Sequence, residues 1–170
     1  MKMRIALVAT LMTFGMASNG LLAQEEEADT DLLTIGSQAP SLDIEHWVQD
    51  GDGTFQPVTK FEDGHVYMVE FWATWCGPCI ASMPHISELQ KEYGDKGLQV
   101  VSVSNEDLET VEAFLEKKVR GEDEMTYGEL TSDYCLTTDP DGSVHKDYMR
   151  AARQNGIPTA FIVGKSGRIE

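Results

Sequence analysis

Two cysteines separated by only two residues constrain this chain most, in the run Trp75-Cys76-Gly77-Pro78-Cys79. At the start of a helix, a pair with this spacing can close reversibly into a disulfide. A thiolate at Cys76 would be stabilised there by unpaired backbone N–H groups and by the positive end of the helix dipole. Pro78 presets the helical backbone in the first turn, and Gly77 leaves room for an approaching sulfur. The motif therefore predicts a redox-active dithiol.

The same spacing also occurs in one half of a structural zinc site. Such a site needs a second pair of cysteine or histidine ligands nearby in the sequence. The one remaining cysteine is Cys135, and the four histidines stand singly at positions 46, 65, 85 and 145. We therefore predict no metal site and no cofactor. Cys135 itself is expected to be a small buried hydrophobic residue, with a third redox thiol as the alternative.

The segments on either side of the motif predict a strand followed by a helix. Residues 65–73 form a β-branched and aromatic run, which is typical of a strand buried on both faces of a parallel sheet. Residues 80–93 predict the helix. Glu70 lies inside the predicted strand, where an ionised carboxylate would be costly to bury. The dithiol is thus expected where a central strand passes into a helix.

At this point the chain resembles a known family. The run from Val69 to Cys79 resembles the active-site segment of thioredoxins and, with Thr74 and the later Met83-Pro84, especially that of the TlpA/ResA branch of exported thiol-disulfide oxidoreductases. Residues 156–161 resemble the segment that carries the cis-proline facing the dithiol. The resemblance extends from about Ile35 to the end of the sequence. It implies an α/β thioredoxin-like fold, with a central mixed sheet flanked by helices and an N-terminal β-hairpin.

The resemblance also implies roles for individual residues. Cys76 would attack a partner disulfide, and Cys79 would resolve the mixed disulfide. Glu70 stands where thioredoxins carry a buried acid that moves a proton to and from the resolving cysteine, with a partly solvated structural glutamate as the alternative. Pro158 is expected to be cis and to face the dithiol. Many members carry a glutamate three residues after the second cysteine, where this chain has Ser82. The expected substrate-contacting residues are Trp75, Gly77, Pro78 and Ile157.

Residues 34–170 are predicted to form one domain. The N-terminal hairpin would pair residues 42–48 with 54–58, and Asn105 would cap a helix that buries Leu108, Val111, Phe114 and Leu115. Only three residues follow the turn at 164–167. They are too few for the strand and helix that normally complete the family's fold, so we expect a C-terminally truncated chain. Further strands are expected at 98–103, 134–137 and 159–163, with a short helix at 144–152.

The N-terminal segment predicts export. Residues 1–23 have the layout of a secretory signal peptide, with Lys2 and Arg4 before an apolar stretch and small residues after it. The stretch is too short and too interrupted for a permanent membrane span. Residues 24–33 are acidic and aperiodic, as in a disordered leader. We expect a protein of the periplasm or cell envelope of a bacterium. A formal net charge of −16 argues against nucleic acid and anionic membranes as partners.

The residues between the cysteines indicate the direction of electron flow. Thioredoxin also has Gly-Pro there, with a potential of about −270 mV, which favours a reductant of protein disulfides. Outside the cytoplasm, such a reductant must be recharged by a membrane thiol donor, for which the resemblance suggests the DsbD/CcdA type. It also suggests apocytochrome c among the clients.

The same residues are compatible with alternative functions. A disulfide oxidase or isomerase would use the same dithiol. A copper-binding assembly factor of related fold would use the two cysteines and a distal histidine such as His145. A peroxidase of the peroxiredoxin type is disfavoured, because the local pattern around its reactive cysteine is absent from this sequence.

Overall fold

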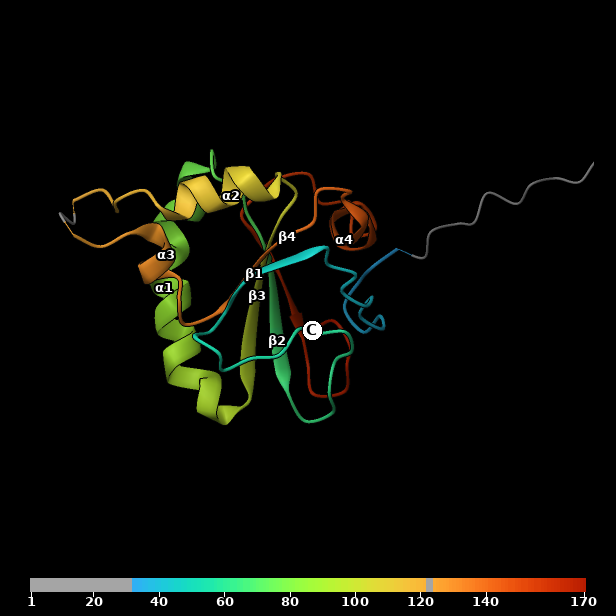
Figure 1. Ribbon diagram of the computed structural model, residues 1–170. Helices are drawn as coiled ribbons and strands as arrows, with labels where there is room; N and C mark the ends of the chain where they lie inside the picture. Colours follow the sequence, from blue (N-terminus) through green and yellow to red (C-terminus); the bar gives the residue numbers. More distant parts are fainter. Residues whose placement is uncertain (1–31, 122–123) are drawn as a thin grey trace, which may run out of the picture.

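The computed structural model describes residues 32–121 and 124–170 (Figure 1). The predicted signal peptide and nearly all of the predicted leader lie outside these residues. Within the described ranges, no helix is both long and apolar enough to cross a membrane. In chain order the elements are β1 (His46–Asp50), β2 (Val66–Phe71), α1 (Gly77–Tyr93), η1 (Gly94–Lys96), β3 (Leu98–Ser104), α2 (Leu108–Leu115), α3 (Tyr127–Leu130), β4 (Cys135–Thr138), α4 (Ser143–His145), η2 (Lys146–Arg150) and β5 (Thr159–Val163).

The five strands form one mixed sheet in the order β1-β4-β3-β2-β5. Strands β2, β3 and β4 run parallel, while β5 is antiparallel to β2 and β1 is antiparallel to β4. Parallel neighbours need crossover connections, which α1 provides between β2 and β3. Figure 1 shows α1 on one side of the sheet and α4 on the other. The predicted thioredoxin-like sheet flanked by helices is therefore confirmed.

The predicted N-terminal hairpin is wrong. Strand β1 begins four residues later than expected and pairs with β4, while the fully described residues 54–58 form no strand. The chain does turn after β1, at Gly51 and its neighbours, which have positive φ. Pro57 cannot donate a ladder hydrogen bond, and Val58 buries its side chain in the core instead. The segment therefore covers the sheet rather than extending it.

Three other local expectations need adjustment. The residue that precedes α2 is Asp107 rather than Asn105, and its side chain makes no capping hydrogen bond. The helix expected at 144–152 is a short α-helical turn followed by the π-helical turn η2. Leu33, assigned to the leader, is buried in the core, and its N–H bonds to the carbonyl of Ala151. The packed part of the chain thus includes the last residue of the predicted leader.

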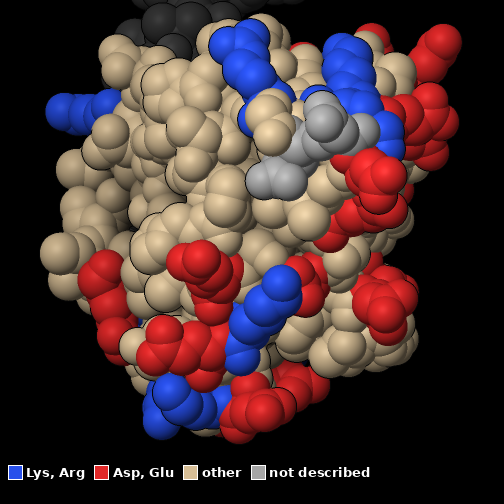
Figure 2. Space-filling view, turned by 90° about the vertical axis from the view of Figure 1, so that its left-hand side faces the viewer, with Lys and Arg blue, Asp and Glu red and all other residues tan. Residues whose placement is uncertain are grey.

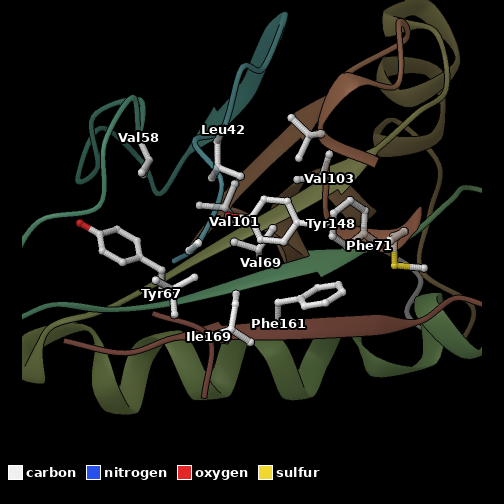
Figure 3. Close-up of a cluster of buried hydrophobic side chains, with 14 of the residues drawn as sticks. Leu42, Val58, Tyr67, Val69, Phe71, Val101, Val103, Tyr148, Phe161 and Ile169 are labelled. Carbon is white, nitrogen blue, oxygen red and sulfur yellow. The ribbon is translucent and has the colours of Figure 1, made fainter. Parts of the chain in front are cut away.

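The sheet separates two clusters of buried side chains. We call the side opposite α1 the apolar face and show its cluster in Figure 3, where residues of β2, β3 and β5 pack against Leu42, Val58 and Tyr148. We call the side covered by α1 and α2 the dithiol face. Side chains alternate along a strand, so neighbours such as Val69 and Glu70 point to opposite faces. The dithiol-face cluster contains Trp72, Ala73, Cys76, Cys79, Met83, Ile86, Val100, Val111, Phe114, Leu115, Tyr134 and Leu136.

Candidate active site

The two motif cysteines lie at the junction between β2 and α1. Cys76 is the N-cap of α1, and it is joined to Cys79 by a disulfide with an S–S distance of 2.02 Å and a Cα–Cα distance of 5.3 Å. The Cys76 Sγ accepts a hydrogen bond from the Cys79 backbone N–H at 3.3 Å. This N–H is one of those that a helix leaves unpaired at its start. The same group is therefore in place to stabilise a thiolate when Cys76 is reduced.

The disulfide is accessible from the side on which the residues between the two cysteines, Gly77 and Pro78, face solvent. Both cysteines are buried, but Trp75 is 73% exposed, and Gly77 and Pro78 are also exposed. The space beside Gly77 is empty, because no atom lies within 4 Å of the position that a Cβ would take. A partner can thus approach over a surface formed by the motif itself.

The second predicted segment lies beside this surface. The Ile157-Pro158 peptide bond is cis, as the resemblance implied. Ile157 packs against the dithiol-face cluster, and with Gly156, Trp72 and Trp75 it lines a pocket of about 360 Å³. The fold therefore brings Ile157 and Trp75 to one site, although they are far apart in the sequence.

Glu70 is a buried carboxyl group on the dithiol face. Its side chain is 3% exposed and points to the same face as those of Met68 and Trp72, which pack against or belong to the cluster that contains both cysteines. One oxygen, Oε2, accepts a hydrogen bond from the Ser102 hydroxyl at 2.7 Å, and Oε1 has no partner within the described residues. Burial raises the pKa of Glu70 to about 7, against the opposing effect of the Ser102 hydrogen bond. This carboxyl group can therefore take up or release a proton near neutral pH.

Glu106 is a residue that the sequence analysis missed. Its carboxylate accepts hydrogen bonds from the Thr74 backbone N–H at 2.6 Å, from the Thr74 hydroxyl at 2.7 Å and from the Ser104 hydroxyl at 3.1 Å. Its own carbonyl accepts a hydrogen bond from the Thr138 hydroxyl. Glu106 thus ties the loop that leads to Cys76 to the ends of β3 and β4. The sequence carried no signal for the contact with Thr74 or with Thr138, because each of these residues is 32 positions away.

The remaining candidates do not form a metal site. Among residues 32–121 and 124–170, no group of three or more His, Cys, Asp and Glu side chains is arranged to hold a metal ion. His145, the distal ligand of the copper alternative, packs its ring edge-on against Phe71 at 5.7 Å between centroids. Cys135 is fully buried in β4, and burial raises its thiol pKa to about 11. The interpretation of Cys135 as a small buried hydrophobic residue is confirmed.

Comparisons with known proteins agree with this geometry. A family model described as the AhpC/TSA family matches residues 35–170. The thiol-disulfide oxidoreductase ResA of Oceanobacillus iheyensis is 29% identical over 143 residues, which cover 84% of this chain and 66% of that protein. The ResA of Bacillus cereus strain ZK is 30% identical over 143 residues, 84% of this chain and 70% of that protein. The chain thus spans about two thirds of the length of these relatives.

Among solved structures, one similar chain comes from Chlorobium tepidum. It is assigned as a thiol:disulfide interchange protein DsbE and is 26% identical, with a TM-score of 0.59. The match covers 81% of this chain and 82% of that structure. The sheet described above therefore belongs to a known type of fold.

Proposed function

The chain belongs to the AhpC/TSA family of thioredoxin-like proteins, and on that premise we propose that it is a thiol-disulfide oxidoreductase acting through Cys76 and Cys79. One observation carries the proposal. The two cysteines form a disulfide at the start of α1, and the Cys79 N–H donates to the Cys76 sulfur. A helix start of this kind favours the thiolate form of the capping cysteine, and the thiolate is the nucleophile of disulfide exchange. The named relatives support the same reaction.

The reaction proceeds by two successive exchanges. The Cys76 thiolate attacks one sulfur of a client disulfide, and the second client sulfur leaves as a thiolate. Cys79, deprotonated, then attacks the Cys76 sulfur of the mixed disulfide and releases the reduced client. The protein ends with the Cys76–Cys79 disulfide, so two electrons have passed to the client. Glu70, with a pKa near 7, accepts the Cys79 proton in this scheme.

The client would bind over the exposed motif residues. Trp75, Gly77 and Pro78 are exposed beside the disulfide, and Ile157 lies at the same site. A proline at position 158 has no backbone N–H, so an extended client segment would pair with the groups of its neighbours. These residues are our proposed substrate contacts.

We further propose that the protein is an exported reductant. The support is the sequence: residues 1–23 resemble a signal peptide, and the Gly-Pro pair between the cysteines is that of thioredoxin. Its clients would be disulfides of bacterial cell-envelope proteins, including the haem-site cysteines of apocytochrome c. A membrane thiol donor of the DsbD/CcdA type would return it to the reduced state.

The potential of the dithiol tests both the function and its direction. The protein is equilibrated with dithiothreitol buffers of known potential, the thiol fraction is measured by alkylation and mass spectrometry, and insulin reduction is followed in parallel. We expect insulin to be reduced and the potential to lie near about −270 mV. A value near about −120 mV would identify an oxidase instead. Failure to exchange electrons with any disulfide would refute the proposal.

A further inference from the structure

A groove opens beside the dithiol, on the outer side of α1. Gly77, which separates the two cysteines, forms one end of it. The groove has a volume of about 390 Å³ and is bounded by α1, by α3 and by the segment that precedes α3. Arg120 is the one charged residue among the described side chains that line it. The lining consists of Gly77, Ile80, Ala81, Pro84, Val119, Arg120, Tyr127 and Leu130.

The charge of the groove differs from that of the chain. The whole sequence has a formal net charge of −16, but the described lining of the groove has a single positive residue and no acidic one. Figure 2 shows this side of the molecule, with uncharged surface in the middle, Lys and Arg along the upper border next to Asp and Glu at the upper right, and more Asp and Glu around a few basic residues lower down. A negatively charged group that approaches the molecule is repelled by most of its surface and attracted by Arg120.

The dimensions match a short piece of extended polypeptide. From Gly77 to Pro84, helix α1 rises about 10 Å at 1.5 Å per residue. An extended segment covers this length with about three residues. A client segment that extends from the Cys76 sulfur past Gly77 would lie along this wall. The groove thus continues the proposed active site rather than forming a separate one.

We propose that the groove binds the client segment next to the reacting cysteine, with an apolar side chain against Ile80 and Leu130 and a carboxylate beside Arg120. This inference rests on the proposed function, because it assigns the substrate class of the same dithiol. The protein then distinguishes its clients by sequence: an apolar residue and an acidic residue within about three positions of the cysteine favour reaction. Residues elsewhere in the client contribute less.

Activated peptides test this preference. Each peptide carries one cysteine as a mixed disulfide with thionitrobenzoate, so attack by Cys76 on the peptide sulfur releases coloured thionitrobenzoate, and Cys79 then frees the peptide thiol. Three peptides differ beside the cysteine, with Leu and Glu, Leu and Lys, or two serines. Hydroxyethyl disulfide serves as a small neutral reference. We expect the Leu-Glu peptide to react about tenfold faster than the serine peptide, relative to the reference.

Two variants with matched controls locate the effect. Arg120→Glu should reverse the order of the Leu-Glu and Leu-Lys peptides, with a change of about fivefold or more in their ratio. Lys96→Glu makes the same change in net charge in η1, beyond the far end of α1, and should leave the ratio as it is. Ala81→Phe fills the groove and should remove the advantage of leucine. His85→Phe places the same phenyl ring on an exposed part of α1 outside the groove lining, and the advantage of leucine should remain in this variant.

The outcomes separate this inference from the proposed function. Equal rates for all three peptides, together with normal reaction of the reference, would overturn the groove and leave the oxidoreductase. No reaction with either peptide or reference would refute the oxidoreductase itself. Sedimentation would reveal a second copy of the chain in the groove as a dimer that Arg120→Glu dissociates, and that result would also overturn the proposed client site.

Discussion

The two faces of the sheet are built for different purposes. The apolar face buries hydrophobic and aromatic side chains. Among them are Phe71, Tyr148 and Phe161, whose ring centroids lie 5.4 to 6.0 Å apart. The dithiol face also has a hydrophobic cluster, but it encloses the two cysteines and buried polar groups such as Glu70 and Ser102. Both faces thus bury apolar side chains, but the redox-active cysteines and the buried carboxyl group of Glu70 lie on the dithiol face.

The difference is clearest at two consecutive residues of β2. Val69 is fully buried on the apolar face, while Glu70 is buried on the dithiol face with one carboxylate oxygen unpaired among the described residues. A valine at such a position stabilises the fold at any pH, whereas a buried carboxyl group stabilises it only when protonated. Near neutral pH, we therefore expect substitution of Val69 by a smaller residue to lower the free energy of unfolding, and substitution of Glu70 by its neutral isostere to raise it.

Removal of the nucleophile has the largest expected effect. Cys76→Ser should abolish insulin reduction completely while leaving the circular dichroism spectrum unchanged, because serine is close to cysteine in size. Cys135→Ser, on the apolar face, is the matched control and should retain activity with a small loss of stability. Cys79→Ser should accumulate a mixed disulfide at Cys76, detectable by mass spectrometry. Trapping through Cys135 instead would contradict the division between the faces.

Glu70→Gln should change stability by a pH-dependent amount. Because the folded pKa is raised from 4.5 to about 7, Glu70 favours the folded state at low pH, and this contribution is lost as the pH rises from 4.5 through 7. Above pH 7 the Gln variant should therefore be more stable than the natural chain by up to about 3 kcal/mol, and below pH 4.5 the gap should vanish. Urea unfolding across this range measures it.

The same variant tests the proton carrier. Loss of the titratable group should slow disulfide reduction, since Cys79 loses the acceptor of its proton. Turnover that matches the natural chain at every pH would return Glu70 to a structural role, even if the stability result holds.

Val69→Ala provides the contrast from the opposite face. We expect a loss of about 2 kcal/mol in the free energy of unfolding, from the lost burial and the residual cavity. The loss should be the same at pH 5 and pH 8, and the potential of the dithiol should not move. A pH-dependent loss, or a shifted potential, would show that the two faces are coupled through the strand.

The smallest effect is expected from Glu106→Gln. Glutamine keeps an acceptor for one of the Thr74 groups but loses the charge, and we expect a destabilisation of about 1 kcal/mol. Glu109→Gln, at an exposed position of α2, is the control and should change stability by less than about 0.5 kcal/mol. Equal effects of the two substitutions in thermal unfolding would show that the tie to the Thr74 loop has no energetic importance.

The sequence predicted the parts of this molecule that local patterns determine. The cysteine pair, the buried strand before it and the helix after it follow from spacing and composition within residues 65–93, and the structure confirms all three elements. The cis bond at Pro158 followed from the resemblance. Family expectations failed at the N-terminal hairpin, where Pro57 and the burial of Val58 outweighed the alternating pattern.

Contacts between distant segments could not be predicted in the same way. Glu106 lies in an acidic stretch that reads as solvated surface, and only the parallel pairing of β2 with β3 brings it to Thr74. The groove beside α1 likewise depends on how the segment around Arg120 returns to the helix. Single-sequence patterns carry no information about such pairings, because each partner has an unremarkable neighbourhood.

The hydrogen bond between the Thr74 amide and the Glu106 carboxylate gives the protein a natural spectroscopic label. The proton of an amide whose nitrogen lies 2.6 Å from a carboxylate oxygen is strongly deshielded, and it is protected from solvent exchange for as long as the contact persists. Its resonance in a nitrogen-correlated NMR spectrum will report the state of the active-site loop. One isolated peak can therefore follow oxidation, reduction and client binding in real time, with no dye attached and no residue replaced.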